Sequence, residues 1–115
     1  MRAIRGAIDV AENTREEIAA ATCSLLTAIA ERNDLVPEDV VSMFFTLTPD
    51  LNAAFPAWAA RQIGWDVPML DMQEIAVPGA LPRCLRVLIH ARGADPARHV
   101  YLGAARSLRP DLEER

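Results

Sequence analysis

The sequence predicts a single mixed α/β domain over residues 1–115, with about five strands and two main helices. Its 115 residues suffice for one hydrophobic core but are too few for two. Short runs in which apolar and polar residues alternate, as in strands, are interleaved with segments of helical character. Turns that contain Pro and Gly, at residues 78–82 and 92–96, separate these runs. Together the three observations favour one sheet packed against helices.

The first half of the chain begins with a strand over residues 2–8. A long helix follows, capped by Asn13 or Thr14 and ending near Asn33. Residues 37–39 form a short turn of helix that leads into a second strand. The apolar stripe of the long helix follows helical spacing: Ile18, Thr22, Leu25 and Ile29. In the second strand the apolar residues Val41, Met43, Phe45 and Leu47 alternate with a polar face that carries Ser42, Thr46 and Thr48 and is interrupted by Phe44.

A second helix is predicted over residues 56–63. Pro56 stands at its first position, where the missing N–H of proline costs nothing, and Gly64 closes it. A short strand over residues 67–72 follows the helix.

The last part of the chain is predicted to be mostly extended. Residues 84–92 form a strand, residues 99–108 form a further extended segment, and residues 110–115 are expected to be a mobile tail. One face of strand 84–92 carries Leu85, Val87, Ile89 and Ala91, and the other carries Arg86, Leu88 and His90.

A sheet of this kind is not fully covered by its own chain. Two helices cannot shield both faces of five apolar strands, and an uncovered face or edge tends to pair with another molecule. We therefore expect one face or edge of the sheet to lie against another subunit.

Composition excludes several classes of function. The net charge is −4 and no basic tract is present, so nucleic-acid binding is disfavoured. No apolar stretch approaches the ~20 residues that span a bilayer, and the N-terminus lacks the apolar segment of a signal peptide, so we expect a cytoplasmic protein without a membrane partner. Cys23 and Cys84 lack metal or redox spacing and are expected to be reduced thiols.

Two arginines stand in apolar surroundings. Arg86 interrupts the strand 84–92, and Arg5 interrupts the first strand. A guanidinium does not lose its proton in a protein, so each must meet an anion or a wet cavity. A structural ion pair and a contact with an anionic ligand explain these residues equally well. All twelve cations are Arg and none is Lys, so an arginine on the surface carries little information here.

Other candidate residues are weaker when each is taken alone. Glu74 is either a solvated turn residue or a site group, and Tyr101 is either a packing residue or a ligand contact. His90 and His99 have no partner at metal-ligand spacing, so no metal site is predicted. The motifs of nucleophilic serine enzymes, phosphate-binding loops and dinucleotide folds are absent, and no cofactor is predicted.

Taken in order, several blocks of sequence resemble the monofunctional AroH class of chorismate mutases. The resemblance spans nearly the whole chain, and its last two blocks are the most specific. The blocks are residues 2–7 (RAIRGA), 48–51 (TPDL), 54–57 (AFPA), 73–74 (QE), 84–87 (CLRV), 98–102 (RHVYL) and 108–112 (LRPDL).

The resemblance implies a homotrimer of pseudo-α/β-barrel subunits, with active sites in the clefts between subunits. It implies conversion of chorismate to prephenate by a cofactor-free Claisen rearrangement. By resemblance, Arg86 contacts the ether oxygen of the breaking C–O bond and Glu74 holds the ring hydroxyl. Arg5 and Tyr101 bind the side-chain carboxylate.

Further residues complete the site that the resemblance implies. Phe55 and Arg61 would come from the adjacent subunit, and Leu108 and Arg109 would form part of a lid. The chain departs from the class at three positions. Trp58 stands where a lysine is common, Ala11 where a glutamate is frequent, and Asp71 adds a carboxylate to the pocket lining. A carboxylate beside a dianionic substrate is unfavourable unless it points away or pairs with an arginine.

Two other functions remain open at the level of sequence. A Rid-type enamine/imine deaminase is also a small α/β trimer that uses an arginine for a carboxylate, although the blocks above do not fit that class. A non-catalytic trimer that binds an aromatic carboxylate would carry the same arginines as an enzyme.

Overall fold

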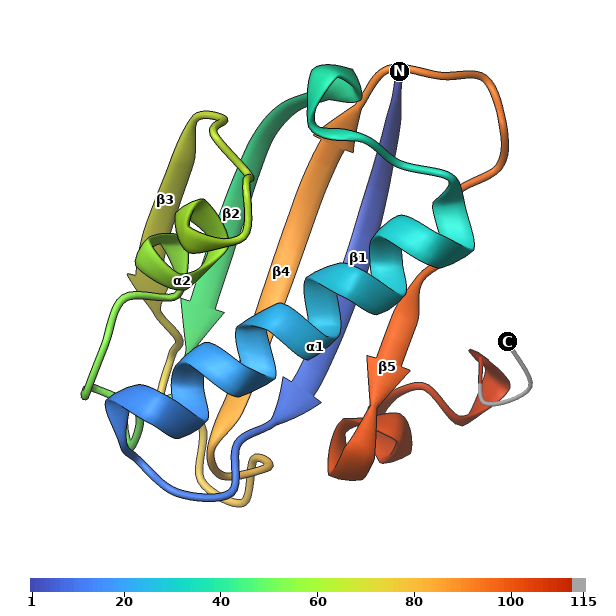
Figure 1. Cartoon of the computed structure of the whole chain (residues 1–115). Coiled ribbons are helices and arrows are strands. Elements are labelled where there is room, and N and C mark those ends of the chain that lie inside the picture. The colour runs from blue at the N-terminus through green and yellow to red at the C-terminus, as the bar shows by residue number, and fades with distance from the viewer. Residues whose placement is uncertain (113–115) are drawn as a thin grey trace.

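The computed structural model describes residues 1–112 and has the predicted mixed α/β architecture (Figure 1). Five strands form one sheet, and two main helices pack on it. Short 3-10 segments cover Pro37–Asp39, Gly103–Leu108 and Pro110–Leu112. The strands and helices are β1 (Arg2–Asp9), α1 (Arg15–Asn33), β2 (Val40–Leu47), α2 (Pro56–Gln62), β3 (Met69–Gln73), β4 (Cys84–Ala91) and β5 (Val100–Leu102).

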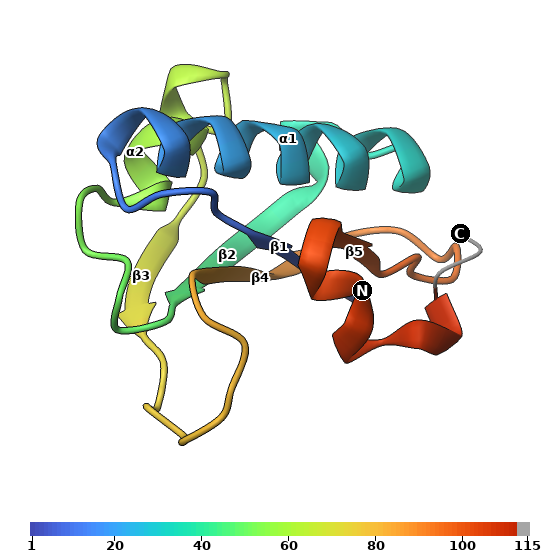
Figure 2. The ribbon, with the colours of Figure 1, turned by 90° about the horizontal axis from the view of Figure 1, so that it is seen from below.

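The sheet has the strand order β3-β2-β4-β1-β5, so β4 is its central strand. β4 is antiparallel to both β1 and β2, whereas β3 and β5 are parallel to their neighbours at the two edges. Both α1 and α2 lie on the same face (Figure 2). The other face, which we call the open face, is covered by neither helix. This agrees with the expectation that two helices cannot shield both faces of five strands.

Helix α1 forms the core with the covered face of the sheet. Thr14 is its N-cap and accepts a hydrogen bond from the Glu17 N–H at 3.1 Å. The close approach of helix and sheet requires Gly6 on β1, because a Cβ there would lie 2.7 Å from Cδ1 of Ile29. The predicted apolar stripe is confirmed, since its members are fully buried: Ile18, Thr22, Leu25 and Ile29.

The central strand β4 alternates as predicted. Its covered-face residues are all buried: Leu85, Val87, Ile89 and Ala91. Its open-face residues are partly exposed: Arg86, Leu88 and His90. Arg86 therefore stands near the middle of the open face, on the most interior strand of the sheet.

Two local predictions were wrong. Val41 was placed on the buried face of β2, but the pairing with β4 is irregular between Val40 and Ser42. The extra residue of this bulge is Val41, and Val40 takes its buried position. The extended segment 99–108 is also shorter than predicted, because the chain turns into a 3-10 helix at Gly103, which has φ +58°.

The termini of the described region complete the fold. Residues 110–112, predicted to begin a mobile tail, form a 3-10 turn, and the rest of that predicted tail lies outside the described residues. Between residues 1 and 112, no helix is both long and apolar enough to cross a membrane.

Candidate active site

Strand register brings the predicted site residues to the open face. Ala7 on β1 and Thr46 on β2 both pair with Arg86, one on each side of it. Tyr101 on β5 pairs with Ala7, so it lies in the same row across the sheet. Because side chains directly opposite one another on adjacent strands lie on one face, Arg86 is flanked by a methyl group and a hydroxyl.

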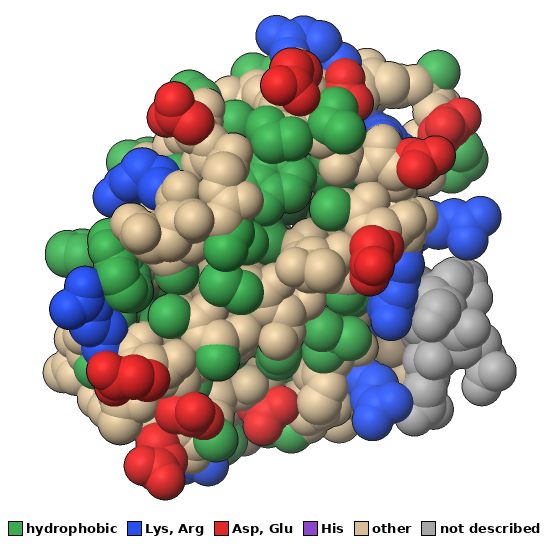
Figure 3. All heavy atoms as spheres, in the orientation of Figure 1, with side chains coloured by type: hydrophobic (Ala, Val, Ile, Leu, Met, Phe, Trp, Pro, Cys, Tyr) green, Lys and Arg blue, Asp and Glu red, His purple; other side chains and the backbone are tan. Residues whose placement is uncertain are grey.

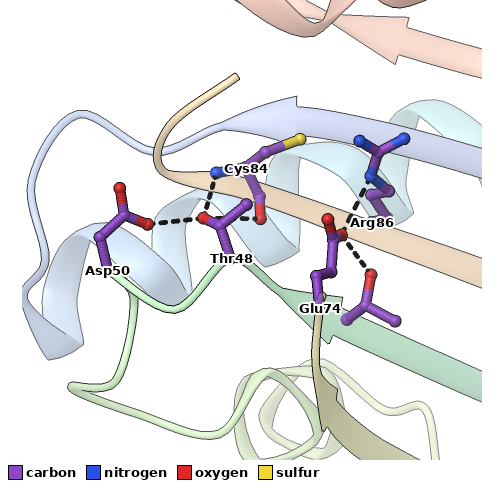
Figure 4. Close-up of polar contacts among 6 residues, drawn as sticks. Thr48, Asp50, Glu74, Cys84 and Arg86 are labelled. Carbon is purple, nitrogen blue, oxygen red and sulfur yellow. Dashed lines mark hydrogen bonds and ion pairs between the residues drawn. The ribbon is translucent and has the colours of Figure 1, made fainter. Parts of the chain in front are cut away.

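The Arg86 guanidinium forms an ion pair with Glu74. Arg86 Nε lies 3.0 Å from Oε2 of Glu74, and the same oxygen accepts a hydrogen bond from Thr46 Oγ1 at 2.5 Å. Glu74 is fixed from its backbone, since its N–H donates to the Leu47 carbonyl at 2.8 Å. Figure 4 shows that only Nε faces Glu74, whereas the two terminal nitrogens of Arg86 point away from it.

A pocket of about 210 Å³ lies over this part of the sheet. The pocket lining combines two arginines and a tyrosine with apolar residues, a composition that suits an organic anion. The residues that line this pocket are Arg5, Gly6, Phe44, Thr46, Arg86, Val87, Leu88 and Tyr101. The structure thus brings together the arginines that the sequence singled out, and Arg86 makes an ion pair while also lining a cavity.

The backbone of Arg5 is hydrogen-bonded to the ring of His99. The Arg5 N–H donates to Nδ1 of His99 at 3.0 Å, so that nitrogen is unprotonated and the ring proton is on Nε2. Burial lowers the pKa of His99, and the nearby charges of Arg5 and Arg109 lower it further. The neutral imidazole is therefore the form that accepts this hydrogen bond from the backbone of β1.

The predicted lid residues lie close to Tyr101. The Arg109 guanidinium carbon is 6.0 Å from the centre of the Tyr101 ring, and Nη2 of Arg109 is 3.0 Å from Oδ2 of Asp111. Leu108 and Tyr101 are partly buried and pack against a small cluster formed by Ala7, Cys84 and Ala105. The segment after β5 therefore borders the pocket that holds Arg5 and Arg86.

Phe55 and Arg61 are not part of this pocket. The Phe55 side chain is 70% exposed and lies next to the start of α2, while Arg61 is exposed near the end of that helix. Phe55 lines a different hollow, of about 330 Å³, between the segment 51–55 and β3. Within one subunit, the two residues are separate from the Arg86 pocket.

Asp71 lines the same hollow as Phe55, but its carboxylate is engaged by the protein. Oδ1 of Asp71 accepts a hydrogen bond from the Ala57 N–H at 3.1 Å, in the first turn of α2. Burial raises the pKa of Asp71, although the Ala57 N–H and the charge of Arg61 partly oppose that effect. The carboxylate is thus directed at a helix terminus, which favours negative charge.

Trp58 also contacts a cation. The guanidinium carbon of Arg15, at the start of α1, is 4.1 Å from the centre of its ring. A positive charge is therefore present beside this position even though Trp58 itself carries none.

Elsewhere the chemistry is sparse. Among residues 1–112, no group of three or more His, Cys, Asp or Glu side chains is arranged to hold a metal ion. Cys23 and Cys84 are free, and burial raises the pKa of the Cys84 thiol to about 11, which keeps it protonated. Figure 3 looks onto the helix-covered face, where acidic and basic side chains are interspersed.

Sequence reasoning missed the part that Thr46 and His99 play at the site. Thr46 was recognised only as a polar residue of its strand, and His99 was weighed only as a metal ligand. The alternation of β2 placed Thr46 on the polar face, but its contact with Glu74 depends on strand pairing that the pattern does not encode.

The fold and the site together define a small α/β domain that presents a cationic pocket for an organic anion on the open face of its sheet. The comparisons with known proteins agree on which such family this is. The family model for chorismate mutase type I matches residues 1–112. The chain belongs to this family, and it is a chorismate mutase, an isomerase of aromatic amino-acid biosynthesis.

Individual relatives support the same assignment over nearly the full length. Chorismate mutase AroH of Thermus thermophilus is 50% identical over 118 residues, covering 98% of this chain and 97% of that protein. Chorismate mutase AroH of Bacillus subtilis (strain 168) is 48% identical over 117 residues, covering 97% and 92%. A solved chorismate mutase from Clostridium thermocellum superimposes with a TM-score of 0.90 at 46% identity, covering 93% of this chain and 99% of that one.

Proposed function

We propose that this protein converts chorismate to prephenate by a cofactor-free Claisen rearrangement, with Arg86 stabilising the negative charge that develops on the ether oxygen. The observation that carries the proposal is the placement of Arg86, which pairs with Glu74 through Nε and lines a pocket together with Arg5. Its terminal nitrogens are directed away from Glu74, so they are available to a ligand (Figure 4).

The chemistry needs little more than this arrangement. A pericyclic rearrangement transfers no proton and uses no nucleophile, so catalysis comes from holding a compact conformer and stabilising charge. The C–O bond breaks ahead of C–C bond formation, which makes the ether oxygen negative in the transition state. A guanidinium fixed at that oxygen binds the transition state more tightly than the ground state.

The remaining pocket residues bind and orient the dianionic substrate. Glu74 is proposed to accept a hydrogen bond from the ring hydroxyl, using the carboxylate that also anchors Arg86. Arg5 and Tyr101 are proposed to bind the side-chain carboxylate. Because the chain has a net charge of −4, attraction for a dianion has to come from this local group of cations.

We further propose that the active site is completed by a neighbouring subunit of a homotrimer in the cytoplasm. The open face of the sheet is covered by neither main helix, and the pocket on it is smaller than a typical ligand site of about 300–1,000 Å³. Phe55 and Arg61 are exposed and separate from that pocket, as residues that act on a neighbour would be. Leu108 and Arg109 would close the site as a lid.

Asp71 lines the hollow next to Phe55, and in this scheme its carboxylate does not repel the substrate. Its carboxylate accepts the Ala57 N–H and lies within the electrostatic influence of Arg61. It thereby supports the helix that presents Phe55 and Arg61 to the adjacent site.

The direct test is turnover by the purified protein with no cofactor added. Chorismate absorbance should fall and prephenate should form in equal amount, identified by its NMR spectrum. Saturable binding of chorismate without turnover would instead indicate a non-catalytic binding module and would contradict the proposal.

A further inference from the structure

The turn after β2 holds a second polar cluster, next to the Arg86–Glu74 pair but not bonded to it (Figure 4). Thr48 Oγ1 donates to Oδ1 of Asp50 at 2.6 Å and accepts from the Cys84 N–H at 2.9 Å. The Asp50 carboxylate also accepts from the Arg83 N–H, with N···O distances of 3.0 and 3.2 Å. Thr48 and Asp50 therefore hold the two residues at which β4 begins.

These contacts lie where the chain crosses the end of β2. β3 is parallel to β2 on one side and β4 is antiparallel to it on the other, so the connection between them has to pass over that end of β2. The connection is exposed along residues 75–80. Glu74 precedes it and Arg86 follows it. A tether at its far end thus fixes where β4 starts relative to β2.

Arg83 is held from the other side as well. Its carbonyl accepts from the Val10 N–H at 2.8 Å, and its Nε donates to the Val10 carbonyl at 3.0 Å. The backbone of Arg83 has φ +45°, a left-handed conformation that residues other than glycine rarely adopt. Bonds from Asp50 and from Val10 therefore fix the last residue before the strand that carries Arg86.

We propose that Thr48 and Asp50 are positioning residues for Arg86, because they fix the start of β4 in the register that places its guanidinium against Glu74. The register itself supports this, since Thr46, two residues before Thr48, pairs with Arg86, two residues after Cys84. The kinetic consequence of this inference rests on the proposed function, whereas its structural consequence does not. Neither Thr48 nor Asp50 lines the pocket that holds Arg86.

Asp50 suits this task because its negative charge persists. The hydrogen bond from Thr48 is the main cause of its lowered pKa; burial opposes that effect, and the Arg83 N–H lowers the pKa further. Asp50 remains an ionised acceptor at any pH at which the enzyme would be assayed.

The first test compares Thr48→Val with Thr48→Ser in the full-length enzyme. Thr48→Val removes every hydrogen bond of the Thr48 hydroxyl, including its long 3.5 Å contact with the Cys84 carbonyl. It should lower kcat about 10- to 100-fold with KM changed far less, since small displacements of a catalytic group are costly. Thr48→Ser keeps the hydroxyl and should recover most of the rate. Thr22→Val, which removes a buried hydroxyl in α1 that donates to the Ile18 carbonyl, is the matched control and should leave kcat unchanged. An unchanged kcat in Thr48→Val, or equal loss in Thr48→Ser, would overturn the inference.

A second variant guards against a folding defect in Thr48→Val. Asp50 is exposed, so Asp50→Asn disturbs no core packing. It should lower kcat in the same direction as Thr48→Val. Asp66→Asn, at another exposed aspartate, should not. Equal kcat for Asp50→Asn and Asp66→Asn would count against a positioning role.

The decisive test combines Thr48→Val with Arg86→Ala. If Thr48 acts through Arg86, adding Thr48→Val to Arg86→Ala should change kcat less than about twofold, whereas independent effects would multiply. The Arg86 Nε–H resonance, identified by its loss in Arg86→Lys, should shift in Thr48→Val and not in Thr22→Val. Multiplying effects or an unshifted resonance would overturn the inference. Full kcat in Arg86→Ala alone would instead refute the proposed function, and the resonance would still decide the positioning claim.

Discussion

Nε of Arg86 lies 3.0 Å from Oε2 of Glu74, and the two residues come from opposite ends of the connection that crosses β2. The Arg86 side chain is 40% exposed and that of Glu74 16%, so the carboxylate is the more enclosed partner. An ion pair this open to solvent adds little to stability by itself. We propose that its use is to fix the orientation of a planar guanidinium whose two other nitrogens point away from Glu74 (Figure 4).

Glu74→Gln should therefore weaken catalysis more than folding. The amide keeps the shape of the side chain but removes the charge that orients Arg86 and that would bind the ring hydroxyl. A hydrogen bond to a charged group is worth about 1.5–3 kcal/mol, which corresponds to a loss of about 10- to 100-fold in kcat/KM. Steady-state kinetics alongside thermal unfolding would check this. A variant that loses stability but keeps kcat/KM would assign Glu74 a structural role only.

The proposed sharing of the active site between neighbouring subunits predicts complementation between two defective subunits. Arg61→Ala and Arg86→Ala each damage a different side of the proposed site, so mixed trimers should regenerate some sites with both arginines. For random mixing of equal amounts, about a quarter of the sites would be intact. Co-expressed, differently tagged subunits should then show kcat/KM well above the mean of the two parents. Activity equal to that mean would place Arg61 and Arg86 in the same subunit's site or outside it.

The rate should depend weakly on pH. No proton moves in the proposed rearrangement, and the lowered pKa of His99 keeps its ring neutral above that value. We expect kcat to be nearly flat from about pH 6 to 9. A bell-shaped profile with a limb near neutrality would indicate a proton-transfer enzyme such as a deaminase.

Much of this fold could be predicted from the sequence because burial on one face gives strands and helices a clear period. Ile18 and Leu25 on α1, and Leu85 and Ile89 on β4, follow that period and are buried. The bulge at Val41 could not be predicted in the same way, because it lies at the start of β2, and the alternation from Met43 to Leu47 is the same with or without it.

The site was predictable only in part. Arg86 was conspicuous because a permanent cation in an apolar strand demands an explanation. Its pairing with Glu74 depends on the path of residues 75–83 across β2, which no local pattern specifies. The direction of Asp71 was likewise hidden, since it depends on where the start of α2 lies relative to β3.

Asp71 should make stability depend on pH in a defined direction. Its pKa is raised in the folded protein, so its contribution to stability is complete below its ordinary pKa and is lost as pH rises through the raised value. The free energy of unfolding of wild type, measured by urea denaturation, should therefore fall relative to that of Asp71→Asn as pH rises from about 4 to 7. Asp66→Asn, exposed to solvent, is the control. A difference that stays constant or changes in the opposite direction would contradict the account of Asp71.

The charge of Arg86 is proposed to act on the transition state, and this proposal is tested by the kcat of Arg86→Ala. The measurement is made with the trimer confirmed intact and with chorismate at saturation. Under these conditions kcat should fall by at least about 10³-fold, because the loss of a single neutral oxyanion donor already costs about 10²- to 10³-fold. Arg86→Lys should recover only part of the rate, because an ammonium lacks the planar fork. An Arg86→Ala enzyme that keeps kcat within a factor of about ten of wild type would contradict the account.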